Sequence, residues 1–269
     1  MSSSDSTPRR LPAGRKAELA AFVADAGEVT VAQLAERFEV SADTIRRDLD
    51  QLDADGVLVR THGGAVGLSA APRPNTELDV RMRLQTQAKE QIGARAAELV
   101  RDGQAVIVNA GTTTLALVRA LADHRDLTVA TNSLRGATEL DPKVYRDLYV
   151  FGGSVRLMDQ ATLGPVRLPA WTHQPEVDIR CDIALIGVGA VSPDVGFSTS
   201  NLVEASMMGE MMDRADKVAV LADSSKFSRR LFAQIAELAR ADYLVTDAPP
   251  PPDLARALAE AGVEVLLPR

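Results

Sequence analysis

One stretch constrains the fold of this chain more than any other: residues 40–65, VSADTIRRDLDQLDADGVLVRTHGGA. Ile45, Leu49 and Leu52 recur at helical spacing and predict one apolar helix face. At 100° per residue, Arg47 lies on the opposite side of that helix from Ile45 and Leu49. The stretch therefore predicts a short helix that buries one side and exposes arginines on the other.

The flanks of this helix predict a second helix before it and a β-hairpin after it. Ser41 stands where its hydroxyl can accept from the amides of the first turn. An earlier helix opens with Thr30 and Gln33, which form a capping-box pair, and a short turn separates the two helices. Gly56 ends the second helix, and residues 57–66 predict strand, tight turn, strand. Helix, turn, helix and hairpin together form a winged helix-turn-helix, an arrangement that enters a DNA groove.

The alternative is an ordinary amphipathic helix whose charged face is solvated and carries an Asp43–Arg47 surface pair. The charge of this segment favours the alternative, because residues 1–66 hold eight basic and eleven acidic side chains. DNA-binding modules usually show a basic footprint. The basic side chains must therefore gather on one face, with the Arg9–Lys16 arm as a further source. The candidate DNA contacts are Ser41, Thr44, Arg46, Arg47, Arg60 and His62.

The stretch resembles the N-terminal signature of the DeoR-type transcriptional repressors. The shared motifs are VS-x-x-TIRRDL, L-x-x-x-G-x-L-x-R and HGGA, which here fall on residues 40–49, 52–60 and 62–65. The resemblance implies that residues 15–66 are a DNA-binding domain and that its double-stranded partner is an operator.

Composition excludes several other classes of protein. The chain has 269 residues, of which 46% are hydrophobic and 25% charged, and carries a net charge of −7. Its single cysteine, Cys181, excludes a disulfide framework and favours a small buried side chain. No apolar run reaches the roughly 20 residues of a membrane span. Residues 1–14 lack the apolar core of a signal peptide, so we expect a disordered tail and a cytoplasmic location.

After residue 66 the pattern changes. Residues 67–80 carry two prolines and several small residues, and they predict a linker. Residues 81–269 then alternate short apolar runs with helical patterns, which predicts an α/β domain with a mostly parallel sheet. The expected strands are Ala105–Val108, Leu127–Ala130, Leu148–Phe151, Asp182–Val188, Lys217–Ala222, Tyr243–Val245 and Val263–Leu267. The expected helices include Ala88–Val100, Leu115–Leu121, Leu202–Met212 and Leu231–Ala239.

Four loops after these strands carry residues suited to a phosphorylated ligand, because ligands bind beyond the carboxyl ends of parallel strands. Glycine and three hydroxyls at a helix N-terminus offer amides and a helix dipole to an anion. The same residues could instead serve only the fold, as helix caps, as tight turns or as a surface ion pair. The candidate effector contacts are Gly111, Thr112, Thr113, Thr114, Asn132, Ser133, Gly152, Gly153, Glu204, Asp223 and Lys226.

This half also resembles the C-terminal sensor domain of DeoR-type regulators. The matching elements are GTTT (111–114), TNS (131–133), FGG (151–153), Gly164, N-x-x-EA (201–205) and DSSKF (223–227). The resemblance implies a fold like that of ribose-5-phosphate isomerase and a phosphorylated sugar or related metabolite as effector. Asn109 stands where an acidic residue is expected, and Pro165–Arg180 matches no pattern of the family.

The sequence thus predicts a transcriptional regulator, a repressor of carbohydrate metabolism genes that a sugar phosphate releases from DNA. We expect a homo-oligomer without cofactor, metal, catalytic residues or membrane contact. The histidines are scattered and the cysteine is alone, which argues against a metal site, and the absence of GxxxxGK[ST] argues against a nucleotide site. The alternatives are an activator using the same site or an isomerase-like enzyme, with Glu204 or Asp223 as base and Lys226 holding phosphate or enolate charge.

Overall fold

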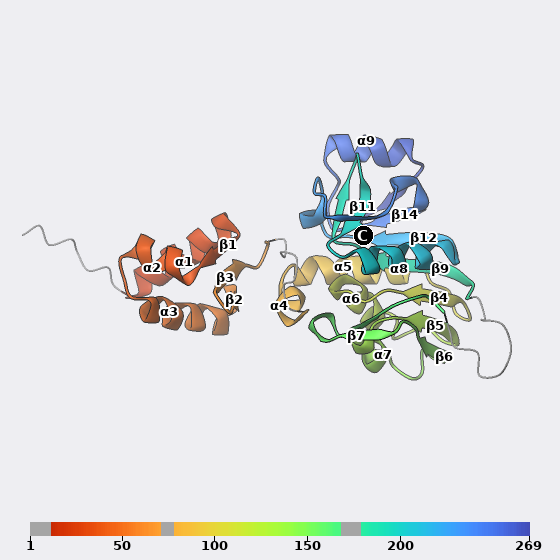
Figure 1. Cartoon of the computed structure of the whole chain (residues 1–269), viewed down its shortest axis with the longest axis horizontal. Coiled ribbons are helices and arrows are strands. Elements are labelled where there is room, and N and C mark those ends of the chain that lie inside the picture. The colour runs from red at the N-terminus through yellow and green to blue at the C-terminus, as the bar shows by residue number, and fades with distance from the viewer. Residues whose placement is uncertain (1–11, 71–77, 168–178) are drawn as a thin grey trace, which may run out of the picture. The chain divides into compact units, whose positions relative to one another are not determined.

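The computed structural model describes residues 12–70, 78–167 and 179–269, which fall into two compact units. The first unit holds residues 12–70 together with Asp79–Gln85, and the second holds Leu78 and Thr86–Arg269 over the described ranges. Figure 1 shows both units, with helices and strands labelled where there is room. None of the helices in these ranges is long and apolar enough to cross a membrane.

The first unit consists of short helices and a three-stranded antiparallel sheet of order β1-β3-β2 (Figure 1). Its elements are α1 (Pro12–Ala26), β1 (Glu28–Thr30), α2 (Val31–Phe38), α3 (Ala42–Ala54), β2 (Leu58–Thr61), β3 (Gly64–Gly67) and, from Asp79 onward, α4 (Leu78–Arg83). The core of this unit includes five side chains with no exposed area, namely Leu19, Val23, Leu34, Ile45 and Leu49.

Local capping explains where α2 and α3 begin and end. The Thr30 hydroxyl accepts from the Gln33 amide at 3.2 Å, and the Gln33 side chain accepts from the Thr30 amide at 2.9 Å. Glu39 ends α2 in a left-handed conformation with φ of 53°. Ser41 then accepts from the Thr44 amide and starts α3. These contacts confirm the predicted helix-turn-helix, and the β2–β3 hairpin confirms the wing.

The wing requires glycine where it passes β1. A Cβ on Gly64 would lie 1.9 Å from the carbonyl oxygen of Val29, so no larger residue fits without moving a strand. The register pairs Gly64 with Thr30 on one side and with Thr61 on the other. This close approach gives a physical reason for glycine in the HGGA motif.

The chain segments around the first unit differ from the expected tail and linker. Helix α1 begins at Pro12, inside the expected tail 1–14, since proline at a helix start is already fixed at a helical φ. Strand β3 includes Gly67, and α4 begins at Leu78, so the expected linker 67–80 contains structured residues at both ends. Residues 1–11 and 71–77 lie outside the described residues.

The second unit is built on a seven-stranded parallel sheet of order β15-β14-β12-β9-β4-β5-β6 (Figure 1). All seven predicted strands belong to it, which confirms the α/β fold class. Its strands are β4 (Ala105–Val108), β5 (Leu127–Thr131), β6 (Tyr145–Val150), β9 (Cys181–Gly187), β12 (Ala215–Leu221), β14 (Tyr243–Val245) and β15 (Glu264–Leu266).

Helices cover both faces of this sheet, because successive strand residues point to opposite sides. Val106 and Val108 pack in a cluster with side chains of α5 and α6, whereas Ile107 packs in a cluster with side chains of α8 and α9. The helices of this unit are α5 (Thr86–Ala97), α6 (Thr112–Ala120), α7 (Leu134–Glu139), α8 (Leu202–Asp213) and α9 (Pro252–Glu260).

The predicted helix over Leu231–Ala239 is wrong. That segment forms β13 (Ala233–Ala236) and the short 3₁₀ helix η3 (Leu238–Arg240). Strand β13 pairs with β11 (Gly196–Thr199), which pairs with β10 (Ala190–Ser192) in a separate antiparallel sheet. The apolar residues have helical spacing, but the unpaired edge of β11 offers backbone hydrogen bonds that a local pattern does not reveal. A further hairpin joins β7 (Ser154–Arg156) and β8 (Ala161–Leu163), and the 3₁₀ helix η1 (Leu157–Asp159) lies between its strands.

Cys181 is buried at the start of β9, as the sequence suggests. Burial, with a smaller contribution from the negative charge of Asp182, raises the pKa of the thiol to about 11. The thiol therefore stays protonated near neutral pH.

Candidate functional site

The candidate DNA contacts lie on the outer side of α3 and on the wing. Ile45, Leu49 and Leu52 are buried, whereas Arg46 and Arg47 are exposed. Asp43 pairs with Arg46, from Nη1 to Oδ1 at 2.6 Å, rather than with Arg47 as the alternative interpretation expects. Within the described residues Arg47 makes no hydrogen bond or ion pair, so its guanidinium remains available to a ligand.

Asp48 is a residue whose role sequence reasoning missed. Its side chain is 7% exposed and its Oδ2 accepts from Nε of Arg15 in α1 at 2.7 Å. This hydrogen bond raises the pKa of Arg15, which is thereby committed to the interior and not to a DNA-contacting arm. The signal was its position three residues after Ile45, which places Asp48 toward the buried side of the helix.

The wing arginine is also engaged within the unit. Arg60 donates its backbone N–H to Asp53 at 2.9 Å, and its guanidinium pairs with Asp50 on α3. His62 lies exposed in the tight turn between β2 and β3. Asp43 and Asp50 offset Arg46 and Arg60, so the surface around α3 carries little net positive charge and the expected gathering of basic side chains on one face is not seen in these two arginines.

In the second unit, the predicted effector loops follow strands that are close neighbours. Loops after β4, β5, β6 and β12 hold the candidates, and only β9 separates β4 from β12. Helix α6 begins directly after the β4 loop, and its N-cap residue, Gly111, provides no side-chain hydrogen bond. The first-turn amides of α6 thus lack the capping oxygen found at α2, α3 and α8.

The threonines of the GTTT motif divide into two kinds. Thr114 is 1% exposed and donates its hydroxyl to the carbonyl oxygen of Asn109 at 2.7 Å. Thr113 is 8% exposed and Thr112 is half-buried. Within the described part of the chain their hydroxyls make no hydrogen bond. Thr114 therefore holds the loop, whereas Thr112 and Thr113 keep donors for a ligand.

Two asparagines hold the ends of the strands together. Asn109 donates to the carbonyl oxygen of Gly187 and accepts from its amide, both at 2.8 Å. Asn132 accepts from the Ala110 amide at 2.7 Å and donates to the Thr162 carbonyl oxygen at 2.9 Å. An aspartate at position 109 could not donate to Gly187, which gives a reason for asparagine where an acid is expected.

Packing accounts for the glycine pair after β6 and for Ser133. Gly152 has φ of 110°, and a Cβ there would lie 2.7 Å from the Thr162 hydroxyl. Gly153 donates its amide to the Leu163 carbonyl oxygen at 2.9 Å. Ser133 caps α7 by accepting from the Gly136 amide at 2.8 Å. Gly152 and Gly153 therefore serve a turn and Ser133 a helix cap, as the structural alternatives predict.

The loop after β12 holds a buried carboxylate and a buried cation. Asp223 is 1% exposed, and its Oδ1 accepts from the amide and hydroxyl of Ser225. Its Oδ2 is buried and has no hydrogen-bond partner among the described residues. Lys226 is 8% exposed. Asp247, which sequence reasoning missed, accepts from the amide and hydroxyl of Ser224 at 2.6 and 2.9 Å. The rule that selected the other loops would have found it, since Asp247 follows the predicted strand Tyr243–Val245.

Glu204 lies in the first turn of α8, which follows β11 of the antiparallel sheet rather than a strand of the parallel sheet. Its Oε2 accepts from the Thr199 hydroxyl at 2.7 Å, and Asn201 caps its amide. Glu204 is thus held by its own neighbours and is half-buried.

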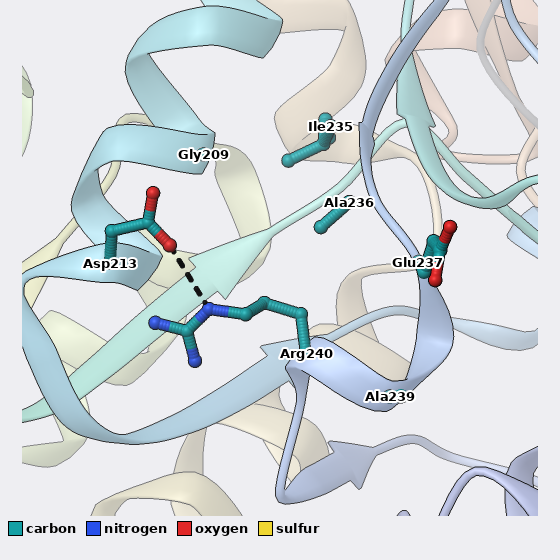
Figure 2. Close-up of a pocket in the computed structure, with 7 residues that line it drawn as sticks. All are labelled: Gly209, Asp213, Ile235, Ala236, Glu237, Ala239 and Arg240. Carbon is teal, nitrogen blue, oxygen red and sulfur yellow. Dashed lines mark hydrogen bonds and ion pairs between the residues drawn. The ribbon is translucent and has the colours of Figure 1, made fainter.

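A separate hollow of about 410 Å³ lies between the last turn of α8 and the β13–η3 segment (Figure 2). Asp213 and Arg240 form an ion pair across it at 3.1 Å. Its described lining contains no candidate effector residue. Among the residues that the structure describes, no group of three or more His, Cys, Asp or Glu side chains could hold a metal ion.

Comparison with known proteins identifies both units. The DeoR-like helix-turn-helix domain matches residues 15–70, and the DeoR C terminal sensor domain matches residues 84–248. The HTH-type transcriptional repressor CsqR of Escherichia coli (strain K12) is 31% identical over 255 residues, covering 95% of each chain. The glycerol-3-phosphate regulon repressor of the same organism is 29% identical over 246 residues, covering 91% of this chain and 95% of the relative.

A ribose 5-phosphate isomerase A from Neisseria gonorrhoeae aligns with 54% of this chain and 55% of its own, at 15% identity and a TM-score of 0.37. The two domain matches cover the helix-turn-helix and most of the parallel sheet, in the order that the sequence motifs predict. The chain belongs to the DeoR family of transcriptional regulators.

Proposed function

We propose that this chain represses transcription from a double-stranded operator and leaves it when a phosphorylated sugar or related metabolite binds the sensor domain. The observation that carries the proposal is the uncapped N-terminus of α6 at the carboxyl edge of a parallel sheet, in a chain whose other unit is a helix-turn-helix. Helix N-termini of this kind bind phosphate through free amides and the helix dipole.

The ligand's phosphate lies on Gly111–Thr114 in this proposal, and Lys226 adds a charge-assisted contact. Neighbouring strands are about 4.8 Å apart, so the loops after β4 and β12 are separated by about 10 Å. A phosphorylated sugar spans that distance. Asp223 and Glu204 are our candidates for accepting the hydrogen bonds of its hydroxyls, while Asn132, Ser133, Gly152 and Gly153 belong to the neighbouring loops of the proposed site.

On the DNA side, Arg47 contacts a base edge and Arg46 exchanges Asp43 for a phosphate. An exposed helical pair such as Asp43–Arg46 is worth at most about 0.5 kcal/mol, so the exchange costs little. Ser41, Thr44, Arg60 and His62 complete the proposed contact surface.

We also propose that the chain acts as a homo-oligomer in the cytoplasm, where operator DNA is found. The weak positive charge around α3, the helix proposed to enter the DNA groove, supports this, because the α3 helices of two copies make contacts that one copy lacks. Exposed apolar side chains in the sensor unit are available for self-association, and they include Leu157, Leu202 and Phe232.

The sensor binds its ligand without converting it in this proposal. The isomerase alternative uses Glu204 or Asp223 as the base. Thr199 donates to one oxygen of Glu204 and Ser225 to one oxygen of Asp223, whereas Oδ2 of Asp223 has no partner among the described residues, so product analysis has to separate binding from conversion. Product analysis after incubation with ribose 5-phosphate tests this point, and formation of a ketose phosphate contradicts it.

Thermal unfolding of the full chain with a panel of sugar phosphates and glycerol 3-phosphate tests the effector proposal. A ligand at 100 times its Kd adds about 2.7 kcal/mol to the free energy of unfolding. We expect some members of the panel to raise the melting temperature and their unphosphorylated counterparts to leave it unchanged. Equal shifts of the melting temperature with phosphorylated and unphosphorylated compounds contradict the proposed phosphate site at Gly111–Thr114.

A further inference from the structure

Asp247 holds the turn that carries Lys226, the lysine to which the proposed function gives a phosphate contact. We propose that Asp247 is a positioning residue of the sensor site, which fixes this turn so that the Lys226 ammonium reaches the ligand phosphate. The inference rests on the proposed function, because it takes the α6 N-terminus and Lys226 as the phosphate site.

The turn is the short 3₁₀ helix η2 (Ser224–Lys226), which follows β12 at the carboxyl edge of the parallel sheet. Inside the turn, the Lys226 amide donates to the Asp223 carbonyl oxygen at 2.9 Å. The Phe227 amide donates to the Ser224 carbonyl oxygen at 3.2 Å. Hydrogen bonds of 3₁₀ helices have poorer geometry than those of α-helices, so such a short turn depends on contacts from outside.

Asp247 supplies an outside contact from the neighbouring strand. It follows β14, which pairs with β12 in parallel. Its Oδ1 accepts from the Ser224 amide at 2.6 Å and its Oδ2 accepts from the Ser224 hydroxyl at 2.9 Å. Both oxygens of the carboxylate therefore hold the first residue of η2. At the other end of the turn, Phe227 is buried in the core cluster below the sheet edge.

Asp223 makes a different kind of contact with the same turn. Its Oδ1 accepts from the amide and the hydroxyl of Ser225, only two residues further on. This contact shapes the turn locally but does not tie it to another strand. Since each carboxylate holds one serine, the amide and hydroxyl donors of Ser224 and Ser225 are engaged within the fold. Lys226 is the cation of the DSSKF motif, so recognition of an anion by this motif falls to its ammonium.

The position of Lys226 depends on the turn because its side chain is only 8% exposed. An exposed lysine can move its charge on a flexible four-carbon stem, whereas packing confines a buried stem to the path that its backbone sets. Oδ2 of Asp223 is buried and has no hydrogen-bond partner among the described residues. The internal contacts of this loop thus leave a polar atom for a ligand, which supports a binding role for the loop.

Loss of the Asp247 carboxylate should release the start of the turn, while Phe227 still holds its end. The Lys226 ammonium then keeps its charge but loses its fixed position, so the affinity for phosphate falls. Asp247→Asn keeps an acceptor for the Ser224 amide and places a donor at the Ser224 hydroxyl, which can accept as well as donate. This variant should keep most of the parental affinity.

A double-mutant cycle on the full chain tests whether Asp247 acts through Lys226. The probe is inorganic phosphate, compared with potassium chloride at the same ionic strength, and the apparent Kd follows from the rise in melting temperature with phosphate concentration. Asp247→Ala should raise this Kd by about 5- to 10-fold, and Lys226→Ala by about 10- to 100-fold. The double variant should match Lys226→Ala alone, because a residue that acts only through Lys226 adds nothing once the lysine is gone.

Two further variants control the experiment. Asp213→Ala removes an exposed carboxylate from its ion pair with Arg240, outside the effector loops, and should leave the phosphate Kd unchanged. Ser224→Ala removes only the hydroxyl contact to Asp247. It should cause a smaller loss of affinity that also disappears in the Lys226→Ala background, and it gives this test a folded protein if Asp247→Ala does not fold.

The outcomes separate the role of Asp247 from the phosphate site itself. Equal losses from Asp247→Ala in the parent and in the Lys226→Ala background overturn the positioning role, as does parental affinity in Asp247→Ala. Equal losses in Asp247→Asn and Asp247→Ala overturn it as well, because charge and not position then matters. A parent that phosphate stabilises no more than chloride overturns the proposed phosphate site, and the role of Asp247 with it.

Discussion

Arg15 donates from Nε to Oδ2 of Asp48 at 2.7 Å, and the two side chains are only 15% and 7% exposed. The contact joins α1 to α3 across the interior of the DNA-binding unit. It explains why an acidic residue occurs in the TIRRDL motif of a helix that approaches DNA: Asp48 faces Arg15 and not the solvent.

Asp48→Ala is therefore expected to destabilise the DNA-binding unit strongly. Removing one partner leaves the other charge buried and unpaired, which costs about 3–5 kcal/mol. Asp43→Ala, which removes an exposed partner of Arg46, should cost less than about 1 kcal/mol. Urea unfolding followed by circular dichroism measures both, and equal losses for the two variants contradict the buried role of Asp48.

The first unit shows how much of its fold local sequence patterns determine. The capping box of Thr30 and Gln33 and the cap at Ser41 depend on neighbours within a few residues, so the sequence was sufficient to predict them. The hairpin was also predicted, but the reason for glycine at position 64 is the carbonyl oxygen of Val29, which only the folded unit brings close. Asp48 was missed because its partner lies 33 residues away, and only the folded unit brings Arg15 to it.

Arg47→Ala should lower affinity for a selected operator by about 1–3 kcal/mol and relax specificity at one position of each half-site. The physical reason is that Arg47 points outward and has no partner among the described residues. Arg46→Ala should weaken binding to operator and random duplexes by similar factors, since it contacts phosphate. Binding selections from random duplexes, followed by titrations, give both values. An equal loss on operator and random DNA for Arg47→Ala shows that Arg47 contacts only phosphate.

Asn109→Asp should destabilise the sensor unit although it introduces the acidic residue expected at that position. The change removes the donor to Gly187 and sets a carboxylate oxygen against the Gly187 carbonyl oxygen. An unsatisfied buried group of this kind costs about 1–3 kcal/mol. Thr112→Ala, in the same loop but half-buried, serves as the matched control. Unchanged melting of Asn109→Asp contradicts the scaffolding role.

The sensor site was only partly accessible to sequence reasoning. Parallel strands place their following loops on one edge, so the loops after β4, β5, β6 and β12 were predicted together. The sequence does not show which polar groups are already hydrogen-bonded within the fold. The Asn132 side chain is hydrogen-bonded to Ala110 and Thr162, and the backbone amide of Gly153 to Leu163. The β10–β11–β13 sheet was missed because its pairing is non-local, and Pro165–Arg180 lies mainly outside the described residues.

Because the positive charge around α3 is weak, we expect that tight binding to operator DNA needs two DNA-binding units, one on each half of an inverted repeat. Sedimentation of the full chain should show at least a dimer, and shortening the operator to one half-site should reduce affinity sharply. A monomer that binds a single half-site as tightly as the full operator contradicts this prediction.

The central claim is that a phosphorylated ligand at the sheet edge releases the operator. It is tested most directly by titrating effector into the operator complex of the parent, Lys226→Ala and Thr113→Ala. Moving a population from 1:99 to 99:1 takes about 5.5 kcal/mol, and one lost charge-assisted contact removes about 1.5–3 kcal/mol. Both variants should bind the operator like the parent without effector and need about 10- to 100-fold more effector to release it. Release at the parental effector concentration would place the phosphate elsewhere.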